Sequence, residues 1–121
     1  MIDWQRVQYF QRREFGDGEP GVEPDPMLVE KLDEARKYAG VPFVIESGLR
    51  TIEHNREVGG VDDSAHVTGK AVDILCTNSR YRWHILDALF AVGFLRVGIG
   101  RNFIHVDIDK DKPKEVAWLY D

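Results

Sequence analysis

The chain has 121 residues, of which 43% are hydrophobic, enough to build one domain around a single modest core. Its formal net charge of −5 argues against a nucleic-acid-binding surface, because such surfaces are strongly basic. No apolar stretch approaches the roughly 20 residues that a membrane span needs, so we expect a globular domain that binds neither nucleic acid nor membrane.

Residues 1–21 are predicted to be an N-terminal extension of this domain. Apolar residues separated by charges over 4–15 predict a short helix that packs on the domain, and the run GDGEPG at 16–21 predicts a turn-rich connector. Residues 1–4 show neither the basic nor the apolar segment of a signal peptide. We therefore expect a protein that is cytoplasmic when it is synthesised.

A capped helix and a strand follow this extension. Asp25 in the N-cap position, Pro26 at the first helical position and Gly40 beyond the end predict a helix between them. Its predicted buried stripe consists of Leu28, Leu32, Ala35 and Ala39. Residues 43–47 predict a strand that delivers Arg50 to the loop at its end.

The segment 51–63 is predicted to be a loop or short helix, and residues 70–75 a short strand. Side chains alternate along a strand, so Asp73 points to the same side as the residues at positions 71 and 75. His66 precedes this strand and arrives from a loop, in which Gly69 permits the turn. This part of the chain therefore contributes one imidazole and one carboxylate.

A second helix is predicted from a cap at Thr77 or Asn78 through Ala91. Its apolar residues predict an inward face made of Trp83, Leu86, Leu89 and Phe90. Residues 94–99 and 103–108, the second of which alternates along the strand, are predicted to pair as a hairpin across the short connection at 100–102.

Together these elements predict one α+β domain over residues 1–121, with a small mixed, largely antiparallel sheet and flanking helices. Residues 113–121 are predicted to be a C-terminal tail, in which Trp118 and Tyr120 either stack on a sugar or pack onto the domain. The single cysteine, Cys76, excludes an internal disulfide and is expected to be a small buried residue.

Three polar residues of these segments can meet at one metal ion. Alternation over 103–108 points His105 off the same side of the sheet as Asp73 on the adjacent strand, and His66 joins them from its loop. Two imidazoles and one carboxylate suit Zn²⁺ and leave a fourth position open for water, as in catalytic zinc sites. The alternative is that Asp73 and His105 are ordinary exposed polar residues of a half-solvated sheet.

Two longer motifs connect these residues with a known family. The segments SGLRTIEHNREVGGVDDSAHVTGKAVDI, at 47–74, and GIGRNFIHVD, at 98–107, resemble the zinc D-alanyl-D-alanine carboxypeptidase family, which shares a fold with the hedgehog signalling domain. Within that family the chain is similar to the small bacterial and phage-borne branch whose site ends in His-x-Asp. The resemblance runs from about Pro24 to about Asp109 and implies the same fold.

The resemblance also implies roles for individual residues. His66, Asp73 and His105 would bind one zinc ion per chain. Arg50 would bind the substrate, the peptide stem of bacterial peptidoglycan, since a guanidinium fork matches a terminal carboxylate or a developing oxyanion. Without the resemblance, a surface salt bridge is the simpler interpretation of Arg50. Ser64 either donates to the substrate or to a ligand carboxylate, or only satisfies backbone groups of its loop.

The general base is the open question of this site. A zinc peptidase needs a base to take a proton from water, and many members of the family carry Glu or Asp three residues before the last histidine. Here that residue is Asn102, which cannot act as a base. Asp107 is the best substitute, although it can equally be a partner that orients an imidazole. Glu46 is a weaker candidate because strand alternation points it away from Ser47.

Two functions of different classes fit these observations. The first is a zinc-dependent peptidase, of carboxypeptidase or endopeptidase type, that uses metal-activated water to cut bonds next to D-amino acids in peptidoglycan stems. We expect such an enzyme to be a monomer and to reach the cell wall after export or lysis. The second is a non-catalytic zinc module that binds cell wall or protein, which Asn102 favours.

Overall fold

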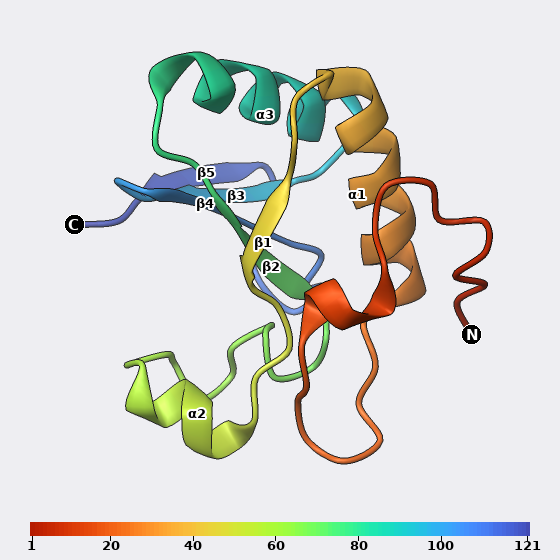
Figure 1. The fold of residues 1–121 in the computed structure, drawn as a ribbon. Helices are drawn as coiled ribbons and strands as arrows, with labels where there is room; N and C mark the ends of the chain where they lie inside the picture. The colour runs from red at the N-terminus through yellow and green to blue at the C-terminus, as the bar shows by residue number, and fades with distance from the viewer.

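In the computed structural model, which describes residues 1–121, the chain forms one five-stranded sheet (Figure 1). The strands lie in the order β1-β2-β4-β3-β5 and comprise β1 (Val44–Ser47), β2 (Ala71–Leu75), β3 (Arg96–Ile99), β4 (Phe103–Asp107) and β5 (Val116–Leu119). All neighbours are antiparallel except β3 and β5, which run parallel. With its flanking helices, this is the predicted α+β architecture with a mixed, largely antiparallel sheet.

Three helices accompany the sheet: α1 (Pro26–Ala39), α2 (Ile52–Glu57) and α3 (Ser79–Ala91). The predicted start of α1 is confirmed, since the Asp25 side chain accepts a 2.8 Å hydrogen bond from the Met27 N–H. Its predicted end is confirmed too, because Gly40 takes the left-handed conformation with φ of 68°. Asn78 caps α3 in the same way, through the N–H of Tyr81.

The core lies between one face of the sheet and the two longer helices, α1 and α3, which Figure 1 shows on the same side of the sheet. The alternate residues of the strands point into it, among them Val72, Ile74, Val97, Ile104 and Val106, all with essentially no exposed surface. The other face of the sheet is therefore left for polar side chains. None of the helices has the length and apolar character that a membrane crossing requires.

The predicted inward face of α3 is wrong at two positions. Trp83 is 71% exposed and Phe90 50% exposed, whereas Ile85, Ala88 and Leu89 are fully buried. At 3.6 residues per turn, Trp83 and Phe90 lie on the side of the helix away from Ile85. Apolar residues occur all around this helix, so its apolar spacing fits more than one face, and the face that packs in the core carries Ile85, Ala88 and Leu89.

The two terminal segments differ from what their sequences predict. Residues 4–15 form only a short 3₁₀ helix at Arg12–Phe15, yet Phe10 and Phe15 are buried in the core. The tail at 113–121 includes β5, which adds a strand to the sheet edge beside β3. Four residues give too short an alternation to predict a strand by themselves.

Candidate metal centre

The polar face of the sheet carries one row of residues that crosses four strands. Asp73 of β2 lies opposite His105 of β4, His105 lies opposite Gly98 of β3, and Gly98 lies beside Trp118 of β5. Because paired residues point to the same face, the register alone brings Asp73 and His105 together. The predicted pairing of these two residues across adjacent strands is confirmed.

His66 joins the pair from the loop before β2. Its Nε2 lies 3.2 Å from Asp73 Oδ1, and His105 Nδ1 lies 2.9 Å from the same oxygen. One ligand atom from each of the three residues falls within 4.8 Å of the others. The loop depends on Gly69, which has a φ of 77° and where a Cβ would collide with the carbonyl of Glu23. The structure thus brings together all three predicted metal-binding residues.

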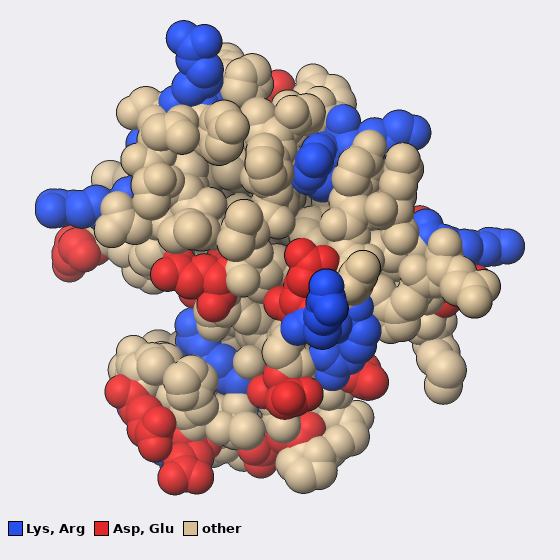
Figure 2. All heavy atoms as spheres, viewed as in Figure 1, with Lys and Arg blue, Asp and Glu red and all other residues tan.

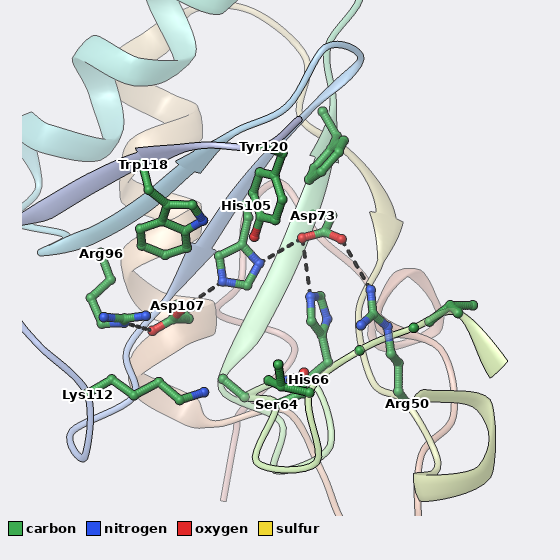
Figure 3. A pocket seen from close by; sticks show the side chains of 16 residues that line it. Arg50, Ser64, His66, Asp73, Arg96, His105, Asp107, Lys112, Trp118 and Tyr120 are labelled. Carbon is green, nitrogen blue, oxygen red and sulfur yellow. Dashed lines mark hydrogen bonds and ion pairs between the residues drawn. The ribbon is translucent and has the colours of Figure 1, made fainter. Parts of the chain in front are cut away.

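Hydrogen bonds set which nitrogen each imidazole offers. His66 Nδ1 lies 2.8 Å from the carbonyl oxygen of Gly48, which can only accept, so Nδ1 carries the proton and Nε2 is free. His105 Nε2 lies 2.7 Å from Asp107 Oδ2 and donates to that carboxylate, which leaves Nδ1 free. Both free nitrogens face Asp73 (Figure 3). This donor set fits a zinc ion, whose histidine ligands commonly donate their other N–H in this way.

The electrostatics of the cluster favour an ionised Asp73. Burial alone raises the pKa of Asp73. Hydrogen bonds from His105 and His66, which form when a proton takes the place of a metal ion on the facing nitrogens, outweigh this, so the pKa of Asp73 lies well below the usual range. Burial lowers the pKa of His105, and its hydrogen bonds to Asp107 and Asp73 outweigh that effect, so this pKa is raised. A proton bound between His105 and Asp73 competes with a metal ion for the same position.

Asp107 lies behind His105 rather than beside Asp73. Its Oδ2 accepts from His105 Nε2, while its Oδ1 accepts from Arg96 Nε at 2.7 Å and from the backbone N–H of Asp109 at 3.0 Å. Only 2% of Asp107 is exposed. Since Nε2 and Nδ1 are on opposite sides of the imidazole, this position favours the orienting role of Asp107 over the role of general base.

Arg96 was not anticipated as part of the site. Besides Asp107, it donates to the carbonyl of Pro113 at 2.5 Å, and its guanidinium lies 4.9 Å from the Trp118 ring. The residue is buried although it is charged. A single arginine within an apolar strand was the available signal, because a buried charge needs a partner inside the protein.

Arg50 lies at the cluster of His66, Asp73 and His105 and not on an open surface. It donates from Nη2 to Asp73 Oδ2 at 3.3 Å, from Nε to Ser47 Oγ at 3.1 Å and from Nη1 to Asn55 Oδ1 at 3.3 Å. Its side chain is 13% exposed. Buried Ser64 accepts from the backbone N–H of His66 at 3.3 Å, so its hydroxyl supports the loop while also lining the cleft.

A cleft of about 570 Å³ opens in front of these residues. Figure 2 shows a hollow between the sheet and the segment that carries α2, with acidic and basic side chains at its edge. The carboxylates that line the cleft are Asp73 and Asp107, while Glu46 and Asn102 are exposed elsewhere. The cleft therefore holds a candidate metal centre with no carboxylate free of other partners.

Comparison with known proteins gives two findings. The chain matches the family described as Peptidase M15 over residues 8–107. The crystal structure of an L-Ala D-Glu endopeptidase, ChiX of Serratia marcescens, is similar in fold, with a TM-score of 0.60 and 22% sequence identity over 88% of this chain and 96% of that chain. Among curated proteins, none matches the chain.

Proposed function

The chain belongs to the peptidase M15 family, and from this premise we propose that it is a zinc-dependent peptidase acting on the peptide stems of bacterial peptidoglycan. The observation that carries the proposal is the convergence of two imidazoles and one carboxylate, His66, Asp73 and His105, in an open cleft. The bonds it cuts would be those next to D-amino acids. The name of the similar ChiX structure, an L-Ala D-Glu endopeptidase, supports a substrate of this class.

A zinc ion at this position would activate water and polarise a carbonyl group, which is the chemistry that amide hydrolysis needs. His66 Nε2, Asp73 Oδ1 and His105 Nδ1 are the atoms that would hold it. Asp107 and Gly48 fix the two imidazole rings by accepting their other N–H groups. Arg50 has donors left beyond its three contacts, and these can bind a carboxylate of the stem peptide.

The proposal is tested by incubating the zinc-loaded protein with purified peptidoglycan and identifying released products by mass. Release of a single D-alanine would identify a carboxypeptidase, and cleavage within the stem an endopeptidase. The variant His105→Ala is compared with a matched control, His84→Ala. His84 is a suitable control because it lies on α3, outside the cleft. The proposal fails if the protein carries one zinc ion per chain and releases nothing.

A second candidate function has one observation in its favour. Asp107 has hydrogen-bond partners on both oxygens, and Asn102 occupies the position of the usual base, so no free carboxylate faces the metal centre. A non-catalytic zinc module that binds cell wall or protein would need none. X-ray absorption of the zinc-loaded protein separates the two: three protein ligands plus a water oxygen favour the enzyme, and four protein ligands the module.

A further inference from the structure

The C-terminal strand builds one wall of the metal cleft. Gly98 of β3 lies between His105 and Trp118 in the cross-strand row, and its lack of a side chain leaves space above β3. A Cβ there would come within 2.5 Å of the Tyr120 ring and 2.7 Å of the Trp118 indole. Both rings therefore reach over β3 to the His105 imidazole, with centroid distances of 5.6 Å for Trp118 and 6.4 Å for Tyr120.

The Tyr120 ring is held in a defined position. Its backbone N–H donates to the carbonyl of Ile99 at 3.0 Å, and its ring packs 5.0 Å from Phe103 and 6.2 Å from Trp118, measured between centroids. Figure 3 shows the hydroxyl pointing into the cleft, toward His105 and Asp73. Because these contacts fix the ring, the hydroxyl needs little reordering to meet a bound molecule.

The surroundings of this hydroxyl leave its proton available. Trp118 packs beside Tyr120, and an indole N–H can only donate, so this neighbour does not take up the proton of the phenol, which keeps its own O–H to donate. Tyr120 is 41% exposed, on the cleft side, so a substrate can reach it.

We propose that Tyr120 is a catalytic residue that donates a hydrogen bond to the carbonyl oxygen of the bond being hydrolysed. This rests on the proposed peptidase function. As water adds to the amide carbon, a C–O bond forms and the carbonyl π electrons move onto that oxygen, where the phenol stabilises the charge. The electrons then return, the C–N bond breaks and the amine leaves with a proton that came from the water. Tyr120 keeps its own proton throughout.

The direct test is Tyr120→Phe, which removes the hydroxyl and keeps the ring contacts. We expect kcat on peptidoglycan peptides to fall by about 10²–10³-fold, the usual effect of losing one such donor, with KM and zinc content unchanged. The matched control is Tyr38→Phe, since Tyr38 is 59% exposed on α1. Wild-type kcat in Tyr120→Phe overturns the proposal. A parallel loss of zinc also overturns it, because the residue would then only support the metal centre.

A binding measurement tests the same donor without turnover. Inorganic phosphate, a small tetrahedral anion, is titrated calorimetrically into the zinc-loaded wild type and Tyr120→Phe. One lost hydrogen bond to a charged group should weaken phosphate binding about tenfold or more, and equal affinities overturn the proposal. If the wild type binds phosphate but does not cleave peptidoglycan, the peptidase function fails, and the difference in phosphate affinity still decides the role of Tyr120.

Discussion

Arg50 hydrogen-bonds the one oxygen of Asp73 that the two imidazoles leave free. In Arg50→Lys the charge remains, but a single ammonium cannot replace donors to Ser47, Asn55 and Asp73 at once. We expect turnover to fall by about 10²-fold through misplacement of substrate, with zinc content near one ion per chain. Metal analysis and steady-state kinetics check this. Wild-type turnover would leave Arg50 with a purely structural role.

Asp107 is the residue whose two interpretations make opposite predictions. Asparagine has one oxygen in place of two, so Asp107→Asn cannot accept from both His105 and Arg96, and its NH₂ group faces a donor. We expect zinc affinity to fall by about 10–100-fold, as for other partners of metal-binding histidines, and turnover to fall with it.

A competition titration with a chromophoric chelator measures the zinc affinity of Asp107→Asn. If the variant instead keeps wild-type zinc affinity and loses turnover by about 10²–10⁴-fold, Asp107 is the general base after all. If it keeps both, the base lies elsewhere, and Glu46 is the next residue to replace.

The helix α1 covers the core, and its start depends on one side chain. Asp25 accepts from the Met27 N–H and pairs with Lys70 Nζ at 2.7 Å, close to the loop that carries His66. Asp25→Ala should cost about 1 kcal/mol of unfolding free energy, measured by urea denaturation. Asp25→Asn keeps a capping oxygen and loses the ion pair, so its cost should be smaller. Equal costs would mean that the pair with Lys70 dominates.

For the whole molecule, zinc should act as a stabilising ligand. Because the three ligand atoms come together only in the folded chain, zinc binds the native state in preference to the unfolded one. At zinc concentrations of about 100 times Kd this adds roughly 2.7 kcal/mol. A chelator should therefore lower Tm reversibly in the wild type and leave the Tm of His105→Ala unchanged. Full zinc occupancy in His105→Ala would contradict the ligand assignment.

The metal-free protein should be most stable at weakly acidic pH, and its free energy of unfolding should fall at both lower and higher pH. Asp25, Asp73 and Asp107 each have a pKa lowered from 3.8, because hydrogen bonds outweigh burial. Such groups stabilise the fold above that pH, and their contribution is lost as pH falls through the lower folded values.

His105 has the opposite sign. Its pKa is raised from 6.5, with burial opposing the larger effect of Asp107 and Asp73, so its contribution is present below that pH and lost as pH rises through the folded value. Urea denaturation of chelated protein across pH measures both losses. Zinc should abolish the loss of stability at higher pH, because the metal ion takes the place of the proton on His105. Persistence of that loss in the zinc-loaded protein would contradict the ligand role of His105.

Much of the fold and of the metal centre could be predicted from local patterns. The N-cap Asp25 and Gly40 bound α1 because capping acts within a few residues. Strand alternation predicted that Asp73 and His105 each point off one face of their strands, and the hairpin of β3 and β4 was predicted from the short connection between them. Each of these signals acts between residues that are close in sequence, so it predicts local structure without reference to the packed molecule.

Only the tertiary structure decided the rest. Arg96 meets both Pro113 and Asp107 behind the candidate metal centre, and the second oxygen of Asp107 accepts from His105 Nε2. Trp118 reaches the cleft because β5 pairs in parallel with β3 across a glycine. Both outcomes depend on which distant segments pack together. The physical reason is that burial stabilises contacts between segments that are distant in sequence, and the local pattern of one segment does not indicate which distant segment it will contact.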